Sequence, residues 1–261
     1  MRDIAEQAKA LGPRGLLHLT GAAGSMPALV ARATALATER PIVLVTEDLE
    51  CARRLGDDLA FFWGARADED TAQGEVLVFS ANETSPYADV NPDRRSAMAR
   101  LMTLFHLAHG LPWRFLVVPA QALARKVVPR AIVSEHSDLI VAEQEIDRDA
   151  LIERLTATGY LRVPVVEDPG TFAVRGSVID LWPPCADLPV RMELYGDLVL
   201  SLRLFDPAAQ RTIGSEDAAA DKPSKNREVS EVWVPPAREA ILTEQAKERA
   251  REVVRALCDA V

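Results

Sequence analysis

The segment that most resembles a catalytic loop is Leu19–Ala28, which reads LTGAAGSMPA and follows the apolar pair Leu16–Leu17. A loop that holds nucleotide phosphates needs glycines, so that backbone N–H groups can wrap the phosphates. It also needs a lysine for the β- and γ-phosphate oxygens and a Ser or Thr hydroxyl for Mg²⁺. The corresponding positions of this loop are Gly21, Gly24, Ser25, Met26, Pro27 and Ala28.

Two of these positions cannot do the chemistry of a phosphate loop. Proline stands at the lysine position and alanine at the hydroxyl position, and Pro27 has no backbone N–H to donate. The simplest interpretation is a strand–turn–helix corner with Pro27 in the first helical turn. A weak anion site at the helix N-terminus is a second interpretation. We therefore predict a degenerate phosphate loop with no nucleotide cofactor, although the glycines leave a divergent nucleotide hydrolase as an alternative.

Other residue patterns do not favour catalysis either. His106 and His109 are three residues apart, whereas a zinc-binding helix places two histidines four apart with a glutamate between them. No G-x-S-x-G nucleophile motif occurs. The three cysteines have neither the number nor the spacing of a disulfide framework or a zinc site; they are Cys51, Cys185 and Cys258. We predict that this chain is not an enzyme and holds no metal.

The composition is that of a globular protein with an acidic balance. The chain has 261 residues, 48% of them hydrophobic, and a formal net charge of −9. Proteins that hold DNA through its phosphates usually show a basic balance, so tight DNA binding by this chain alone is disfavoured. There is no apolar run that could span a bilayer, and acidic and basic residues interrupt Met1–Leu19, unlike a signal peptide. The expected location is the cytoplasm, with no membrane partner.

The first half of the chain alternates strand and helix patterns. Ile42–Val45, Val76–Phe79 and Phe115–Val118 are short apolar runs typical of strands buried in a parallel sheet. The expected helices between them cover 27–37, 48–63 and 96–109, the last with Ser96 as N-cap and Gly110 after its end. This alternation predicts an α/β domain.

The pattern changes after about residue 136. A short helix is expected over Ala150–Thr158, followed by strand-like runs over 171–182, 190–195 and 198–205 with turn residues between them. This favours an α+β domain with an antiparallel sheet. Residues 214–228 are polar and typical of a linker, and a charged helix is expected over about 237–260.

Strand alternation places arginines and aromatics together on one sheet face. Adjacent side chains of a strand point to opposite faces, so Leu200, Leu202 and Leu204 are expected to face the core. The outward set is then Arg175, Arg191, Glu193, Tyr195, Arg203 and Phe205. Arginines and large aromatics are enriched in interface hot spots. An ordinary solvated face is the alternative, and a nucleic-acid stacking platform is a third possibility that the acidic balance disfavours.

At this point several motifs together resemble a known family. LTGAAGS, ETSPYADVNPD, GTFAVRGSVIDLWPP, LPVRMELYGD and SLRLFDPAAQRT occur in an order similar to that of the N-terminal, UvrB-like module of bacterial transcription-repair coupling factors (Mfd). The resemblance covers about Gly15 to Leu242. It implies a UvrB-like α/β domain, 1–136 plus 227–261, that carries an inserted α+β domain, 137–226, which binds the repair ATPase UvrA.

The resemblance also implies site residues and partners. The UvrA-facing positions carried over by motif are Arg175, Arg191 and Tyr195, the last often Phe in the family, and with weaker support Arg203 and Phe205. Two departures favour Mfd over UvrB. UvrB keeps an intact phosphate loop, whereas the loop of this chain is degenerate. UvrB also has an aromatic-rich insertion that grips DNA, and Tyr87 is the only aromatic in the corresponding segment of this chain. The implied function is non-catalytic UvrA recruitment in nucleotide excision repair, in contact with other domains of a longer ATP-dependent DNA translocase. RNA polymerase and DNA would be bound only through parts beyond this chain. The alternative is a UvrB-like domain that binds DNA or a nucleotide.

Overall fold

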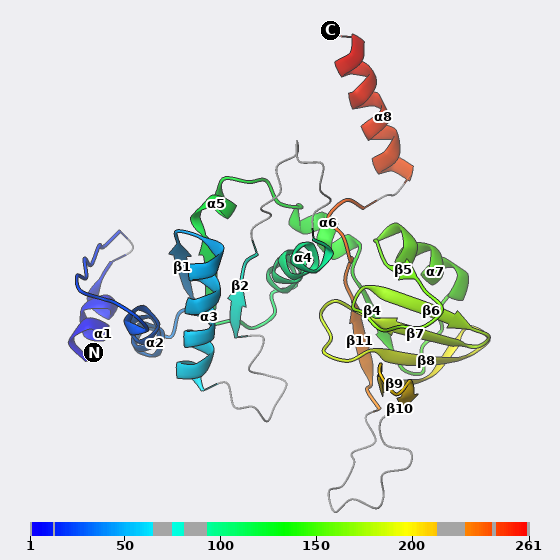
Figure 1. The fold of residues 1–261 in the computed structure, drawn as a ribbon, viewed down its shortest axis with the longest axis horizontal. Coiled ribbons are helices and arrows are strands. Elements are labelled where there is room, and N and C mark those ends of the chain that lie inside the picture. The colour runs from blue at the N-terminus through cyan, green and yellow to red at the C-terminus, as the bar shows by residue number, and fades with distance from the viewer. Residues whose placement is uncertain are drawn as a thin grey trace, which may run out of the picture. The chain divides into compact units, whose positions relative to one another are not determined.

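The computed structural model describes residues 2–12, 14–64, 75–80, 93–212, 228–241 and 244–259. The segment around Tyr87 and nearly all of the expected linker at 214–228 lie outside these residues. The contacts divide the chain into two compact units, Met1–Val127 and Val128–Val261. Parallel and antiparallel sheets both occur, so the predicted mixed α/β class is confirmed (Figure 1).

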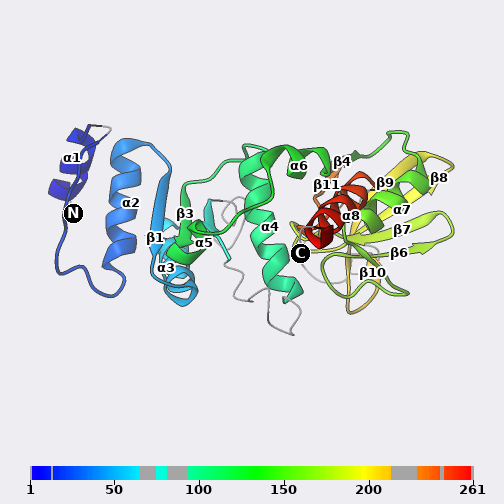
Figure 2. The same ribbon diagram turned by 90° about the horizontal axis from the view of Figure 1, so that it is seen from above.

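The first unit contains a three-stranded parallel sheet, ordered β1–β3–β2. Its elements are α1 (Arg2–Ala10), α2 (Met26–Thr38), β1 (Ile42–Thr46), α3 (Leu49–Trp63), β2 (Val76–Val78), α4 (Arg94–Ala108), β3 (Phe115–Pro119) and α5 (Ala120–Leu123). Figure 2 shows this unit from above. The three helices and three strands expected after residue 26 are present, with bounds shifted by a few residues.

Helices cover the parallel sheet because its strands are apolar on both faces. Alanines of α2 and Leu59 of α3 pack with Phe115 and Val117 of β3 in one buried cluster. On the other face, Leu104 of α4 packs with Val118. β3 is largely buried on both faces as predicted, whereas Val43 and Val45 of β1 are 55% and 56% exposed, so the prediction of burial on both faces is wrong for β1.

Aspartates begin two helices of this unit by accepting backbone N–H groups that have no partner within the helix. Asp48 accepts from Cys51 N at 2.8 Å at the start of α3. The expected N-cap of α4 was wrong: Asp93, not Ser96, occupies this position, and its Oδ2 accepts from Ser96 N at 2.9 Å. The accepted hydrogen bonds lower the pKa of both carboxyl groups, Asp48 and Asp93, and so keep them charged.

The close approach of α3 to β2 makes Gly56 sensitive to substitution. In an open helix, Gly→Ala stabilises by about 1 kcal/mol. A Cβ at Gly56 would lie only 2.4 Å from Val78 Cγ2, and valine has little rotamer freedom with which to move away. We expect Gly56→Ala to lower the free energy of unfolding by about 1–2 kcal/mol, whereas the same change in an open helix would raise it.

Urea denaturation followed by circular dichroism would measure this change in the free energy of unfolding. Gly12→Ala is the matched control, because a Cβ there meets no atom within 4 Å. A stabilised Gly56→Ala protein would contradict the packing of α3 on β2.

The second unit contains a six-stranded sheet, ordered β10–β9–β8–β7–β6–β5, and a two-stranded sheet of β11 and β4. Its elements are α6 (Arg130–Glu135), β4 (Asp138–Val141), α7 (Arg148–Ala157), β5 (Leu161–Arg162), β6 (Thr171–Arg175), β7 (Val178–Trp182), β8 (Val190–Tyr195), β9 (Leu198–Asp206), β10 (Arg211–Thr212), β11 (Glu231–Val234) and α8 (Glu244–Asp259). The predicted antiparallel arrangement is confirmed for β6 to β10, whereas β5 pairs parallel with β6.

The run over 171–182, expected as one strand, is a hairpin of two strands. Arg175 pairs with Val178, so that the connection is only Gly176 and Ser177. Gly176 has a φ of +61°, which glycine adopts without a steric penalty. The hairpin returns Val178 to the same sheet face as Arg175.

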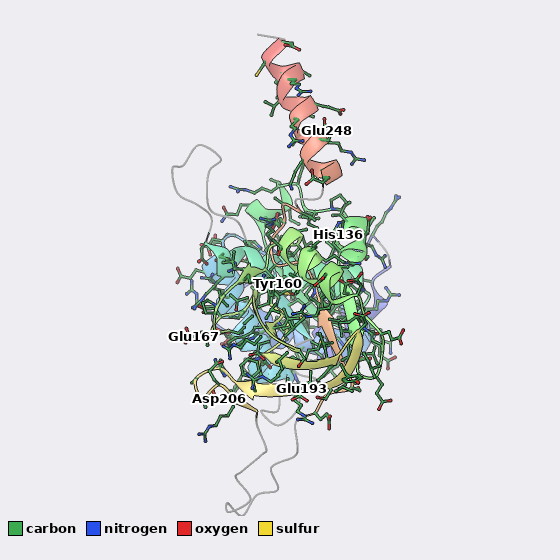
Figure 3. All side chains as sticks on the ribbon, turned by 90° about the vertical axis from the view of Figure 1, so that its right-hand side faces the viewer. His136, Tyr160, Glu167, Glu193, Asp206 and Glu248 are labelled. Carbon is green, nitrogen blue, oxygen red and sulfur yellow. The ribbon has the colours of Figure 1, made fainter. Side chains whose placement is uncertain are left out.

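Segments far apart in the sequence meet at β4. The register pairs Asp138–Val141 with Glu231–Val234. Nearby, the hydroxyl of the buried Tyr160, which is labelled in Figure 3, donates to Pro235 O at 2.7 Å, and Ala237 N donates to Thr158 O at 2.9 Å. These contacts satisfy polar groups that would otherwise be buried without partners. They fix residues 231–237 to the start of this unit.

Cys51, Cys185 and Cys258 have free thiols. Among the described residues, no helix combines the length and apolar character needed to cross a membrane, and no group of metal-ligating side chains is present.

Candidate partner-binding site

The register of the six-stranded sheet aligns the predicted site residues on one face. Ala173, Asp180, Arg191 and Arg203 are successive partners across β6, β7, β8 and β9. The neighbouring row joins Arg175, Val178, Glu193 and Ser201. We call these eight residues the arginine face. The opposite face carries the core, including Phe172, Ile179, Leu181, Met192 and Leu202.

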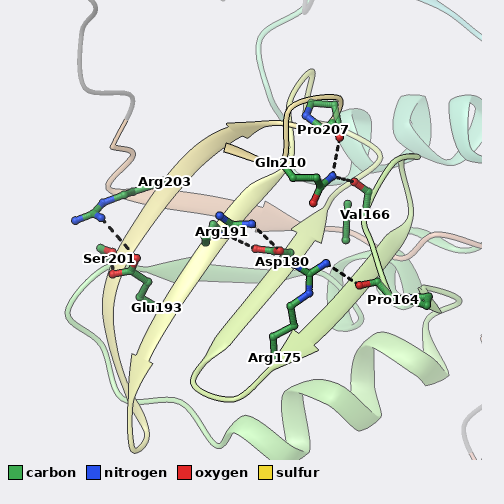
Figure 4. Close-up of polar contacts among 10 residues, drawn as sticks. All are labelled: Pro164, Val166, Arg175, Asp180, Arg191, Glu193, Ser201, Arg203, Pro207 and Gln210. Carbon is green, nitrogen blue, oxygen red and sulfur yellow. Dashed lines mark hydrogen bonds and ion pairs between the residues drawn. The ribbon is translucent and has the colours of Figure 1, made fainter. Parts of the chain in front are cut away.

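Arg191 is fixed by two interactions within the arginine face. Its Nε donates to Asp180 Oδ1 at 2.7 Å and its Nη2 donates to Oδ2 at 2.9 Å (Figure 4). The guanidinium carbon also lies 4.8 Å from the centre of the Phe205 ring. The Asp180 hydrogen bonds raise the pKa of Arg191 above its ordinary value. Arg191 is therefore charged, and its guanidinium is held in place by Asp180 and Phe205.

Phe205 is buried, contrary to the expectation that it faces outward. It is 0% exposed and packs with Val166 and Ala173, with Val163 and Trp182 at the edge of the cluster. It lies on the predicted side of the sheet, but residues 163–168, which link β5 to β6, pass over it. Periodicity could not predict this cover, because it comes from a segment outside the strand.

Arg175, Tyr195 and Arg203 are the predicted site residues that reach solvent. Arg175 is exposed, and its Nη2 donates to Pro164 O at 2.7 Å. Arg203 is half-exposed and lies 3.5 Å from Glu193 Oε1 and 3.9 Å from Glu228 Oε1. Tyr195 is 77% exposed at the end of β8, beside the Gly196–Asp197 turn.

A β-bulge corrects the expected orientation of Leu200. Glu193 pairs with Ser201 and Leu194 pairs with Val199, so Leu200 is an extra residue without a partner on β8. Leu200 is 51% exposed rather than in the core, whereas Val199 is fully buried. The bulge keeps Ser201 and Arg203 on the arginine face, and it adds an exposed leucine near Tyr195.

Two polar residues of this region were not predicted from the sequence. Asp180 is 1% exposed, and its pairing with Arg191 follows from strand register, which alternation alone does not give. Gln210 follows β9, and its Nε2 donates to Val166 O at 3.0 Å and to Pro207 O at 2.6 Å. The FDPAAQ turn gave no sequence pattern for this role.

The loop at 21–28 has a helix but no preceding strand. Residues 15–23 have no regular secondary structure, and Leu16 is 89% exposed, so the expected strand–turn–helix corner is wrong at its strand. Gly21 and Gly24 have φ of +76° and +59°, and Ser25 is the N-cap of α2 without a side-chain hydrogen bond. Pro27 lies in the first turn, as expected. Ala28 is fully buried in the core, so this position faces away from any ligand at the loop.

The comparisons with known proteins first define a class of domain. Residues 139–226 match the family described as the UvrB interaction domain. This match covers the six-stranded sheet and therefore the whole arginine face.

The same comparisons then identify relatives over most of the chain. It is 39% identical over 225 residues to the transcription-repair-coupling factor of Myxococcus xanthus, which covers 86% of this chain and 18% of that protein. The factor of Escherichia coli (strain K12) is 33% identical over 211 residues, covering 80% and 17%. That of Bacillus subtilis (strain 168) is 31% identical over 238 residues, covering 90% and 18%. The chain thus spans less than a fifth of these relatives' length. The predicted resemblance to transcription-repair coupling factors is confirmed.

Proposed function

We propose that this chain is a non-catalytic docking module of a transcription-repair coupling factor, and that its arginine face, with Tyr195, binds the repair ATPase UvrA. The observation that carries the proposal is the coincidence of two results. The match to the UvrB interaction domain covers 139–226, and within it Arg175, Tyr195 and Arg203 reach solvent from one region of one sheet. In this role the chain recruits UvrA to stalled transcription in the cytoplasm.

The domain organisation belongs to the same proposal. Residues 137–226 form a domain inserted into an α/β domain made of 1–136 and 227–261, a division that differs from the two compact units because residues 231–237 pack against β4 and Tyr160. An inserted domain must leave its host at nearly the point where it returns, and β4 and β11, at the two ends of the insertion, are paired antiparallel. The bounds of the family match, 139–226, also agree with the insertion.

The loop at 21–28 supports the non-catalytic part of the proposal. Pro27 offers no N–H and no charge to a phosphate, and the buried Ala28 cannot supply a hydroxyl to Mg²⁺. No cofactor is therefore proposed for this chain. The ATP-driven translocation of DNA and the binding of RNA polymerase are assigned to the rest of the longer protein.

The binding proposal predicts the effect of two substitutions on UvrA affinity. Arg175→Ala combined with Tyr195→Ala removes an exposed guanidinium and an exposed phenol ring from the proposed surface. We expect a loss of about 2 kcal/mol or more, roughly thirtyfold in Kd, as for other hot-spot truncations. Isothermal titration calorimetry with purified UvrA would measure it. Arg191 is left unchanged, because its removal would also strip the buried Asp180 of its partner.

The matched control is Arg53→Ala together with Phe61→Ala. Both residues are exposed on α3, outside the matched residues 139–226. This pair should bind UvrA like the wild type. Equal affinity of the Arg175/Tyr195 variant and the wild type would refute the proposed surface.

A further inference from the structure

The segment Val163–Asp168, which we call the strap, crosses the arginine face between β5 and β6. Its inner residue, Val166, is 0% exposed and packs against Phe205. Its outer residues are exposed and include Pro164, Val165 and Glu167 (Figures 3 and 4). The strap therefore has one side in the core and the other on the surface beside Arg175.

Two side chains hold the middle of the strap through its backbone carbonyls. Arg175 Nη2 donates to Pro164 O at 2.7 Å, and Gln210 Nε2 donates to Val166 O at 3.0 Å. Arg175 is the last residue of β6 and Gln210 directly precedes β10, so the two side chains tie the strap to the sheet at two points. At its ends the strap is tied by Val163 N to Phe172 O and by Thr171 Oγ1 to Asp168 O.

The position of Gln210 is specialised for this contact. Its backbone has a φ of +55°, which glutamine rarely adopts, so the residue is held in a strained conformation at the end of the turn. Both of its acceptors, Val166 O and Pro207 O, are carbonyls, which requires the NH₂ group to face them. Its buried Oε1 has no partner among the described residues. These two hydrogen bonds of the Gln210 side chain are thus both donated by its NH₂ group.

We infer that the outer side of the strap is part of the partner-docking surface, and that Gln210 is a positioning residue that presents this surface in the correct conformation. This inference rests on the proposed function. A partner that contacts Arg175 must also meet Pro164, because the Arg175 guanidinium lies on the Pro164 carbonyl. The exposed Val165, at 38%, offers it an apolar contact next to that charge. The occupant that fits is the protein partner of the interaction domain, UvrA.

The physical basis is preorganisation. A strap that is already ordered loses little conformational entropy when the partner binds, whereas a loosened strap must be ordered at that moment. Gln210 itself is half-buried below the strap. Its removal should therefore change affinity through the strap and not through a lost contact with the partner.

The test measures strap opening and UvrA binding separately in the full chain. Gln210→Ala removes both hydrogen bonds, and Gln210→Glu keeps the side-chain length, but a carboxylate cannot donate. Both variants should speed hydrogen exchange of peptides that cover 163–168, without speeding exchange in β7 and β8. Both should weaken UvrA binding by about three- to tenfold, comparable to one net hydrogen bond. Gln121→Ala, an exposed glutamine of α5, is the control and should change neither measurement.

The outcomes separate this inference from the proposed function. Tyr195→Ala should weaken UvrA binding without changing exchange of the strap, because Tyr195 lies at the hairpin end of β8. Gln210 variants that loosen the strap yet bind UvrA with unchanged affinity would overturn the inference and leave the proposed surface intact. Unchanged exchange of 163–168 would overturn it as well, because Gln210 would then not hold the strap. A wild-type chain that does not bind UvrA would overturn the proposed function and this inference together.

Discussion

Replacing Phe205 by alanine is expected to lower the free energy of unfolding by about 3–5 kcal/mol, the range for a large aromatic in a close-packed core. The ring is fully buried under Val166 and against Ala173, and the Arg191 guanidinium stacks on it. Its removal leaves a cavity and takes away the aromatic surface below a charged group. Chemical denaturation monitored by tryptophan fluorescence would measure the change.

Phe61→Ala is the control for this substitution. Phe61 is 79% exposed on α3, so its truncation should change the unfolding free energy by no more than about 0.5 kcal/mol. Equal effects of the two substitutions would mean that Phe205 is not in the core. They would favour instead the exposed position that strand alternation alone predicts.

The second large effect is expected for Asp180→Ala. This change removes the carboxylate that receives both Arg191 hydrogen bonds and leaves a guanidinium with only 18% of its side chain exposed. An unpaired, mostly buried charge costs several kcal/mol, and the partial exposure of Arg191 reduces the penalty to about 2–3 kcal/mol. The double variant Asp180→Ala, Arg191→Met should recover part of this loss, because neither charge is then buried.

Glu193→Gln provides the comparison for Asp180. Glu193 also pairs with an arginine on the same face, but that pair is 3.5 Å apart and about 40% exposed on both sides. Solvent screens such a pair, so its loss should cost less than about 1 kcal/mol. Thermal unfolding of the wild type, Asp180→Ala, the double variant and Glu193→Gln would rank their stabilities. A Glu193 effect as large as that of Asp180 would contradict the difference in burial between the two pairs.

The sequence predicted the elements of this fold better than their long-range pairing. Apolar runs such as Phe115–Val118 gave the parallel strands because a strand buried on both faces must be apolar throughout. The α4 cap shifted from Ser96 to Asp93 because both residue types can cap and only backbone geometry chooses between them. The pairing of β4 with β11, about ninety residues apart, leaves no local pattern.

Strand alternation predicted which arginines share a sheet face, but it failed at the bulge and at the segment that covers Phe205. Arg175, Arg191 and Arg203 share a face, as expected. The bulge at Leu200 inserts a residue and reverses the orientation expected for it. A two-residue period contains no information on bulges, nor on a strap that covers Phe205 from outside the strand. The roles of Arg191 and Arg175 therefore differ more than their shared sheet face suggested, since Arg191 is bound to a buried carboxylate and Arg175 to a backbone carbonyl.

The contacts between residues 158–160 and 235–237 have a consequence for the order of events during synthesis. The antiparallel strands β6 to β9 are neighbours in sequence and can pair as soon as they leave the ribosome, because their loop-closure cost is small. Tyr160 and β4 must wait until β11 and Pro235 have been translated. During that interval, the Tyr160 hydroxyl lacks this acceptor and one edge of β4 is open to other chains. The synthesis of β11 and Pro235, and not the formation of the large sheet, therefore completes the pairing of β4 and reduces the risk of misassembly there.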